Sequence, residues 1–423
     1  MSDAGNNWKS RPLGELATTT SGGTPSRARK DYYGGSIPWV KSGELNDDYI
    51  FDTEEHITEA GLKNSSAKVF SSGTILIALY GATVGKTSIL RTDASTNQAV
   101  CGITPGPDLD AGYLRFHLIS LRRELLSHRY GGAQPNISQQ IVRNQKIAYP
   151  PLPEQKKIAH ILSTVQRAIE AQERIIQTTT ELKKALMHKL FTEGLCHEPQ
   201  KQTEIGPVPE SWEVVHLGEF FQIKHGYAFD GKFFKPSGDH ILMTPGHFHE
   251  EGGFREQGEK TKYFKGEIPQ DYVLAKDDLV VAMTEQTSGL LGSAAFVPEG
   301  DLYLHNQRLG LIVDLDEKRL SKRFLFYLFN HPHLRVEVAK TSTGSKVKHT
   351  SPTKLRAVKV GIPPSLDEQE EIASALSTTQ QKISVATNKK SQLQDLFRTL
   401  LNELMTAKIR VHELDFSTGE HPA

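Results

Sequence analysis

The sequence predicts an α+β protein: two mixed α/β domains joined by two long helices that pair antiparallel as a coiled coil. Three observations carry this prediction. The same order of motifs occurs twice along the 423 residues, which indicates duplicated domains with pseudo-two-fold repeat symmetry. Each copy begins with short β-branched runs separated by Gly, Pro, Ser and Asp. Each copy ends in about forty residues that contain neither Pro nor Gly and carry a heptad pattern.

The repeat is defined by three pairs of matching motifs. They are Trp8 with Leu13-Gly14-Glu15 and Trp212 with Leu217-Gly218-Glu219, Asn97-Gln98 and Asn306-Gln307, and Glu154-Gln155 and Glu368-Gln369. The offset between the copies grows from 204 to 214 residues, as small insertions would produce. Such a period is too long for a solenoid and indicates duplicated domains.

Strands are predicted first in each copy, followed by a short helix and one more strand. The predicted strands are Ile37–Val40, Thr74–Leu79 and Lys86–Leu90 in the first copy, and Leu279–Ala282, Ser293–Val297 and Leu309–Val313 in the second. The amphipathic helices are expected at about 111–127 and 321–338. The last strand of each copy leads to a Pro-Pro pair, where the long helix begins.

The long helices are predicted at about 154–193 and 368–408. Their apolar lines are Ile161, Ala168, Ile175 and Leu182 in the first, and Leu376, Ile383, Phe397 and Leu404 in the second. Ser365 and Glu368 predict a capping box at the start of the second helix, and Gly194 predicts the end of the first. Two ordinary core helices are the alternative, but the narrow apolar seam favours a coiled-coil pair.

This organisation predicts domain boundaries and a spacing. The expected segments are a first domain at 1–152, a long helix at 153–195, a linker at 196–208, a second domain at 209–365, a second long helix at 366–410 and a tail at 411–423. Antiparallel pairing would place the two domains at opposite ends of a rod of roughly 60 Å. Dimeric DNA-binding proteins meet two half-sites with such paired readers. One chain with two different readers would meet two different half-sites.

Composition excludes a membrane protein and leaves nucleic acid open. Lys plus Arg and Asp plus Glu each total 50, so the formal net charge is zero and only the local distribution of charge is informative. No apolar run approaches the roughly 18 residues that span a bilayer, and the polar start gives no secretory signal. Cys101 and Cys196 fit no ligand pattern. We expect a cytoplasmic protein with no membrane partner.

Local charge indicates where nucleic acid would bind. No acidic residue occurs between Glu124 and Glu154, or between Glu337 and Asp367, and both windows hold a Gly-, Ser- or Thr-rich loop at the same place in the repeat. Basic side chains and bare backbone N–H groups bind phosphate, whereas Gln, Asn and Arg can read base edges. The candidates from these windows are Arg129, Gln134, Asn136, Arg143, Ser345, Lys346 and Lys348. A solvated loop is the alternative interpretation.

A second set of candidates follows matching strands. Asn and Gln are the side chains that read adenine, and Arg reads guanine. These candidates are Tyr80, Asn97, Gln98, Gln286, Asn306, Gln307 and Arg308. Packing within a turn or at a strand edge explains each of them equally well, so both interpretations stay open here.

The chain resembles the specificity subunits of type I restriction-modification enzymes over essentially its whole length. The resemblance is carried by the duplicated order of Trp-x4-Leu-Gly-Glu, Ser21–Ser26, Ile37–Val40, Tyr80–Lys86, Pro150–Gln155 and Lys189–Leu195. The second copy departs from this pattern, because Lys224–Phe229 stands where the first copy has Gly-Gly-Thr-Pro. Within and beside these motifs we expect DNA contacts from Thr24, Lys41, Thr83, Lys86, His225 and Tyr227.

The resemblance implies a function and a set of partners. Each domain would recognise one half of a two-part, asymmetric site in double-stranded DNA. The helices would set the gap between the halves and dock two methyltransferase subunits, and restriction/translocase subunits would join through them. The resemblance implies no cofactor and no catalytic residue in this chain.

Enzymatic alternatives find little support in the residues. Gly81–Ser88 looks like a phosphate-binding loop but has three residues between its glycines where that motif has four. A self-sufficient adenine methyltransferase would need an Asn/Asp-Pro-Pro-aromatic motif, and the Pro-Pro pairs follow Tyr149 and Ile362 instead. His247, His249, His331 and His333 lack further ligands at metal-binding spacing. An assembly scaffold without DNA contacts remains the other alternative.

Overall fold

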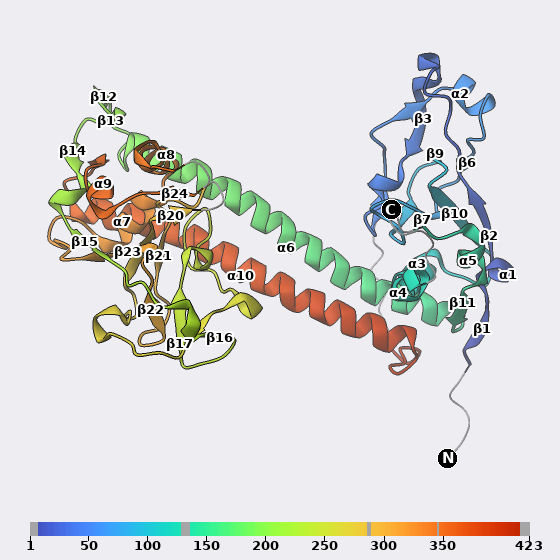
Figure 1. The fold of residues 1–423 in the computed structure, drawn as a ribbon. Coiled ribbons are helices and arrows are strands. Elements are labelled where there is room, and N and C mark those ends of the chain that lie inside the picture. The colour runs from blue at the N-terminus through green and yellow to red at the C-terminus, as the bar shows by residue number, and fades with distance from the viewer. Residues whose placement is uncertain (1–6, 128–135, 286–288, 345–346, 415–423) are drawn as a thin grey trace. The chain divides into compact units, whose positions relative to one another are not determined.

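The computed structural model describes residues 7–127, 136–285, 289–344 and 347–414, and it divides into two compact units. Unit 1 comprises residues 1–173 and 387–423, and unit 2 comprises residues 174–386. The long helices α6 (Leu152–Glu193) and α10 (Leu366–Met405) each contribute one part to each unit. Figure 1 shows the elements of both units.

Unit 1 carries two sheets and a short ribbon. The larger sheet has the order β2-β10-β7-β8-β4, the smaller has the order β5-β3-β9-β6, and β1 pairs with β11. The strands are β1 (Lys9–Pro12), β2 (Ala17–Ser21), β3 (Tyr33–Val40), β4 (Tyr49–Ile50), β5 (His56–Ile57), β6 (Val69–Phe70), β7 (Ile75–Ala78), β8 (Thr87–Leu90), β9 (Ala94–Thr96), β10 (Val100–Pro105) and β11 (Lys146–Tyr149). The helices are α1 (Leu13–Leu16), α2 (Glu59–Lys63), α3 (Ala111–Ser120), α4 (Arg122–Ser127) and α5 (Gln139–Asn144).

Unit 2 repeats this plan with diverged details. Its sheets have the orders β15-β23-β19-β21 and β16-β18-β17-β22, and three two-stranded pairs join β12 to β13, β14 to β25 and β20 to β24. The strands are β12 (Gln200–Thr203), β13 (Gly206–Pro209), β14 (Glu213–His216), β15 (Gln222–His225), β16 (Phe234–Lys235), β17 (His240–Met243), β18 (Tyr263–Phe264), β19 (Leu279–Ala282), β20 (Thr284–Glu285), β21 (Ala294–Phe296), β22 (Tyr303–His305), β23 (Leu309–Val313), β24 (Lys348–His349) and β25 (Lys359–Ile362). The helices are α7 (Lys322–Phe329), α8 (Pro332–Thr341) and α9 (Pro352–Arg356).

The strands predicted from β-branched runs are confirmed. Strands β7 and β19 are buried at every position, which explains why their sequences are continuous apolar runs rather than alternating ones. One four-stranded sheet in each unit contains a parallel pair, β3 with β9 in unit 1 and β17 with β22 in unit 2. Strand β9 leads directly into the turn that contains Asn97, and β22 leads into the turn that contains Asn306.

The two predicted amphipathic helices are each two shorter helices. In unit 1, α3 ends at Ser120 and α4 begins at Arg122, whose side chain donates to the carbonyl of Gly85 at 2.8 Å. In unit 2 the break falls before Pro332, which opens α8. Proline lacks the N–H that a helix interior needs, so it occupies the first helical turn instead. The prediction of one continuous helix was therefore wrong in both copies.

The long helices pair antiparallel, because in each unit the early part of one lies against the late part of the other (Figure 1). In unit 1, Lys390 Nζ lies 2.9 Å from Glu173 Oε1. In unit 2, Lys183 Nζ donates to Gln380 Oε1 at 2.6 Å.

Each core also combines its globular domain with both helices. The unit 1 core includes Tyr113, Ile158, Leu162 and Leu404, and the unit 2 core includes Phe191, Trp212, Phe324, Ile372 and Leu376.

The apolar line predicted on α6 leaves the helix interface in its second half. Ile161 and Ala168 are half-buried, but Ile175 is 44% and Leu182 is 57% exposed. A straight α-helix drifts about 20° per heptad from a strict seven-residue repeat, so a line extended over three heptads rotates away from the partner helix. The predicted line on α10 is confirmed as buried or half-buried along its length.

The predicted ends of the helices are confirmed in part. Gly194 has φ = 66°, the left-handed conformation that terminates a helix. Ser365 accepts from the backbone N–H of Glu368 at 3.4 Å, but the Glu368 carboxylate does not return to Ser365 as a capping box requires. It binds groups beyond the end of α6 instead.

Among the described residues, no helix combines the length and hydropathy that a bilayer span requires.

Candidate nucleic-acid interface

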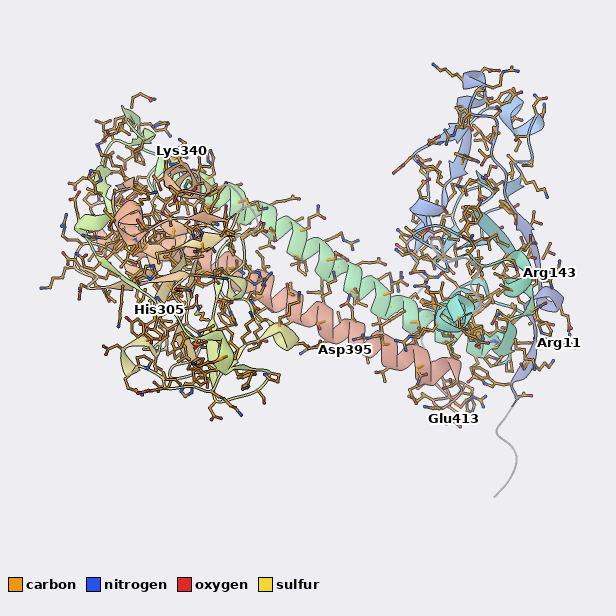
Figure 2. All side chains as sticks on the ribbon, in the orientation of Figure 1. Arg11, Arg143, His305, Lys340, Asp395 and Glu413 are labelled. Carbon is orange, nitrogen blue, oxygen red and sulfur yellow. The ribbon has the colours of Figure 1, made fainter. Side chains whose placement is uncertain are left out.

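In unit 2 the predicted residues His225, Tyr227, Asn306, Gln307 and Arg308 come together at the turn after β22. The Tyr227 N–H donates to the carbonyl of His305 at 2.9 Å, and the Gln307 N–H donates to the carbonyl of Tyr227 at 2.9 Å. Figure 2 labels His305 in this part of the unit. Segments eighty residues apart in the chain therefore form one surface.

Gly226 makes this approach possible. A Cβ on Gly226 would collide with the backbone oxygen of Asn306, so any side chain there would force the two segments apart. The neighbouring Tyr227 ring is 42% exposed and packs edge-on against Phe229 at 5.1 Å between centroids. An exposed, rigid aromatic ring thus stands beside the turn.

In both units the asparagine of the Asn-Gln pair holds the turn and the glutamine faces outward. Asn306 Oδ1 accepts from the Arg308 N–H at 2.9 Å, and Asn97 Oδ1 accepts from the Ala99 N–H at 3.1 Å. Each asparagine therefore holds its own turn, as Asn commonly does. Gln98, Gln307 and Arg308 are exposed. These side chains face outward and the asparagines face inward, a distinction that sequence alone left open.

A second cluster in unit 2 is built on the pairing of β20 with β24. Glu285 is 5% exposed, and one of its carboxylate oxygens accepts backbone N–H groups from Gly289, Leu290 and Leu291 at 3.1, 2.8 and 2.8 Å. Lys348 Nζ lies 3.8 Å from the same carboxylate. Glu285 thus organises the loop that follows it. Gln286, Ser345 and Lys346, which the sequence predicted here, lie outside the described residues.

In unit 1, Thr24, Tyr80, Gln98 and Asn136 come together. The Thr24 hydroxyl donates to Gln98 Oε1, and Tyr80 also hydrogen-bonds the Gln98 side chain. Tyr80 forms a bridge with Asn136 across the two backbones. Burial raises the pKa of Tyr80, so its hydroxyl stays protonated. This cluster is made of neutral donors and acceptors.

The other predicted residues of unit 1 differ in their ion pairs, hydrogen bonds and burial. Lys41 Nζ lies 2.8 Å from Glu54 and 3.2 Å from Glu55, and these hydrogen bonds raise the pKa of Lys41. The Thr83 hydroxyl donates to the carbonyl of Ser42 at 2.7 Å. Lys86 is half-buried and makes no ion pair with any described residue. The charge of Lys41 is therefore already balanced, whereas that of Lys86 is not.

Arg143 packs against the Leu-Gly-Glu motif rather than standing in a loop. It lies on α5, and a Cβ on Gly14 would come within 3.2 Å of its Nε atom. The equivalent Arg356 donates to the carbonyls of Gly218 at 3.0 Å and Phe221 at 3.1 Å. The glycine of the repeated motif therefore makes room for an arginine. Figure 2 labels Arg143. Arg129 and Gln134 lie outside the described residues.

The Glu-Gln pair at the start of each long helix makes equivalent contacts in both units. Glu154 accepts from Arg410 Nε and Nη2 at 2.8 and 2.9 Å, just beyond the end of α10. Glu368 Oε1 accepts from the Leu195 N–H at 3.3 Å and Trp212 Nε1 at 3.2 Å, just beyond the end of α6. Each helix start thus holds the segment that follows the other helix.

The glutamine of each pair ties the helix to its globular domain. Gln155 Oε1 accepts from the Asp110 N–H at 2.9 Å, and Gln369 Oε1 accepts from the Ser321 N–H at 2.7 Å. Asp110 and Ser321 are the N-caps of α3 and α7. Each glutamine also donates to the carbonyl of the proline six or five residues before it. From the sequence the pair served only as a marker of the repeat, although its recurrence after Pro-Pro was the available signal.

The structure gives the enzymatic alternatives no further support. Strand β8 follows Gly81–Lys86 directly, where a phosphate-binding loop would lead into a helix. Burial lowers the pKa of His247 and of His331 to about 4, so both rings are neutral and packed. His331 stacks on Phe191 at 4.7 Å between centroids. Within the described ranges, no group of three or more His, Cys, Asp or Glu side chains could hold a metal ion.

Comparison with protein families decides the class of this chain. The family model for the type I restriction modification DNA specificity domain matches residues 5–180 and again residues 209–395. The chain belongs to this family. The match occurs once per copy of the repeat, so it confirms both the duplication and the family that the order of motifs resembled. It also groups the chain with specificity subunits rather than with catalytic ones.

Curated relatives and solved structures agree. The type I restriction enzyme MjaVIII specificity subunit of Methanocaldococcus jannaschii is 32% identical over 320 residues, covering 73% of this chain and 72% of the relative. The MjaIX specificity subunit of the same organism is 29% identical over 232 residues, covering 52% of each chain.

A crystal structure of a type I restriction-modification S subunit from M. genitalium shares the fold. It aligns with a TM-score of 0.64 and 16% identity, covering 96% of this chain and 97% of that one. A second structure, from work on complex assembly and conformational transition of the type I restriction-modification system, aligns with a TM-score of 0.52 and 17% identity, covering 94% and 97%. The α+β architecture with two long helices is thus that of this family.

Proposed function

We propose that this chain is the DNA-recognition subunit of a type I restriction-modification complex and reads an asymmetric, two-part site with one half per globular domain. The observation that carries the proposal is an equivalent Asn-Gln turn in each of the two units. In both, an asparagine holds the turn and presents outward side chains, Gln98 in unit 1 and Gln307 with Arg308 in unit 2. Such side chains can read base edges.

The two reading surfaces differ in chemistry, which supports different half-sites. Around Gln98 the neighbours are the neutral Thr24 and Tyr80, whereas around Gln307 they include the exposed Arg308 and His225. Neutral hydroxyl and amide groups favour other base patterns than a guanidinium does. We propose further DNA contacts from the other candidate residues of both units, among them Lys41, Thr83, Lys86, Arg143 and Lys348.

The division of labour follows the segments. We assign half-site recognition to 1–152 and 209–365, spacing and assembly to 153–195 and 366–410, and a linking role to 196–208, with 411–423 as a tail. Large apolar side chains exposed on the long helices support a role in assembly, because burying them against a partner would be favourable. These are Ile175, Leu182, Val385 and Leu396. We propose that two methyltransferase subunits dock there and that restriction/translocase subunits join the resulting complex.

The test is modified-base sequencing of DNA from cells that express this chain together with its neighbouring methyltransferase. We expect methyladenine in one asymmetric motif of two parts with a fixed gap. Cells with the methyltransferase alone are the control. Methylation that is the same with and without this chain would refute a recognition role and favour an assembly scaffold.

A salt titration addresses direct DNA contact. Phosphate contacts release counterions, so we expect the affinity of the methyltransferase complex for its site to fall steeply with salt. A complex whose DNA affinity is unchanged by removal of this chain would again favour a scaffold.

A further inference from the structure

A hollow opens in unit 2 beside the turn that carries Arg308. Its volume is about 450 Å³, within the range of ligand-binding clefts. Three stretches line it: the segment from Leu242 to Glu250, the segment from Arg255 to Lys262, and Thr284 with Leu290 and Arg308. Of this lining, the sequence singled out Arg308 as a candidate DNA contact and His247 as a histidine without further metal ligands at suitable spacing.

Positive charge dominates the lining. It contains Arg255, Lys260, Lys262 and Arg308, against one carboxylate, that of Glu250. None of the four cations forms an ion pair with another described residue, although acidic side chains pair with lysines elsewhere in the unit. Four unpaired cations around one hollow repel one another, so the arrangement favours an electron-rich ligand.

Arg255 is anchored through one nitrogen of its guanidinium group, and Arg308 is fixed at its backbone. Arg255 donates through Nε to the carbonyl of Gly246 at 3.0 Å, which leaves its terminal nitrogens available. The backbone of Arg308 donates to Asn306 Oδ1 at 2.9 Å and accepts from the Met283 N–H at 2.9 Å. The anchor at Nε reduces the conformational entropy that Arg255 loses when its terminal nitrogens bind an acceptor pair.

We propose that this hollow reads a G·C base pair in the second half-site. Arg308 and Arg255 donate to guanine O6 and N7, Glu250 accepts from cytosine N4, and Lys260 and Lys262 contact the flanking phosphates. These are the pairings that base-edge geometry favours. The inference rests on the proposed DNA-recognition function and names one base pair of its target.

Adenine recognition fits this hollow less well. Gln257 is the adenine-type reader in the lining, but its amide packs over Gly246, where a Cβ would collide with it. The free donors at the hollow are therefore guanidinium and ammonium groups.

The test uses the chain in complex with its methyltransferase and duplexes that carry each single base-pair change in the methylated motif. For Arg308→Ala, we expect cognate affinity to fall about 10- to 100-fold and discrimination to vanish at one G·C position of the second half-site. The first half-site is an internal control, because its reading is unchanged. Lys318→Ala, an exposed cation of the same unit outside the hollow, should bind as the wild type does.

Two further variants separate base reading from phosphate contact. Arg308→Lys keeps the charge but replaces the planar fork with a single ammonium group, so discrimination at the G·C position should fall, but less than in Arg308→Ala. Lys260→Ala should weaken all duplexes alike and lower the slope of log affinity against log salt by about one. If Arg308→Lys and Arg255→Ala both discriminate against base-pair changes at the G·C position as fully as the wild type, the hollow does not read this base pair.

The DNA motif that is methylated in the presence of the wild-type chain tests the G·C assignment separately from the proposed DNA-recognition function. A two-part motif without a G·C pair in its second half overturns the inference and leaves the proposed function standing. Absence of any two-part motif overturns the proposed function, and the inference with it.

Discussion

At the residue scale, neighbouring side chains in the two Asn-Gln turns face in different directions. Asn97 and Asn306 were expected to read bases or to hold turns, and their side-chain oxygens hold turns. The residues after them point outward. Sequence pattern located the turn in both copies, but which side chain faces inward depends on the local backbone direction.

Gly226→Ala tests the close approach of the two segments that form the unit 2 surface. A methyl group there collides with the Asn306 backbone, so we expect recognition of the second half-site to fall at least tenfold while the first half-site is read as before. Gly231→Ala is a matched control, because its Cβ would meet its nearest neighbour at an ordinary 3.8 Å. Duplexes altered in one half at a time provide the measurement, and equal behaviour of the two variants would contradict the prediction.

Glu154→Gln tests the contact between the start of α6 and Arg410. Glu154 is 4% exposed and Arg410 is 22% exposed at its side chain, so loss of the pair should destabilise unit 1 by about 2 kcal/mol, less than a fully buried pair. Denaturant unfolding of the complex with its methyltransferase provides the measurement. Lys408→Gln, at a more exposed pair, should change stability by under about 0.5 kcal/mol.

The same contact predicts a pH dependence. Burial by itself raises the pKa of Glu154, but its hydrogen bonds and charge interaction with Arg410 outweigh this, and the pKa lies below its ordinary value. The unfolded chain therefore binds a proton first as pH falls, and the stabilisation is present above about pH 4.3 and is lost on further acidification. Glu154→Gln should flatten this part of the stability profile. An unchanged profile would show that other carboxylates dominate.

At the scale of elements, the long helices combine a buried seam with exposed apolar positions. Leu190 is buried in the unit 2 core, whereas Leu182, two turns earlier on α6, is 57% exposed. Heptad counting predicted both helices, but it could not follow the drift of a straight helix from the seven-residue repeat.

Leu182→Lys separates folding from assembly. We expect a stability change within about 0.5 kcal/mol, because the site is exposed, together with weaker binding of the methyltransferase. Leu190→Lys should instead unfold unit 2, since it buries an unpaired charge. Co-purification and circular dichroism of both variants provide the measurements. Undiminished methyltransferase binding by Leu182→Lys would remove this position from the proposed docking face.

At the scale of the whole molecule, the repeat is expressed as two units that each contain a globular domain and parts of both long helices. The Glu-Gln pairs give each helix start a fixed relation to its own domain and to the end of the other helix. A change of helix length between these anchor points should therefore leave both reading surfaces intact.

Insertion of one heptad in each long helix, after Glu173 and after Ala386, tests this expectation. Seven residues add about 10 Å to a helix, or roughly three base pairs of DNA. We expect the methylated motif to keep both halves and to gain a longer gap. Insertion in α6 alone is the control, because it should disturb the pairing with α10. A changed half-site sequence would contradict the assignment of spacing to the helices.

The sequence by itself determined the duplication, the strands β7 and β19, the two long helices and the family, because periodicity and motif order are local properties repeated along the chain. Only the tertiary structure decided how the candidate surfaces are assembled. The hollow brings Glu250 and Arg255 together with the distant Arg308, and the anchor of α6 pairs Glu154 with Arg410, 256 residues later in the chain. Such contacts depend on long-range packing, which no local pattern encodes.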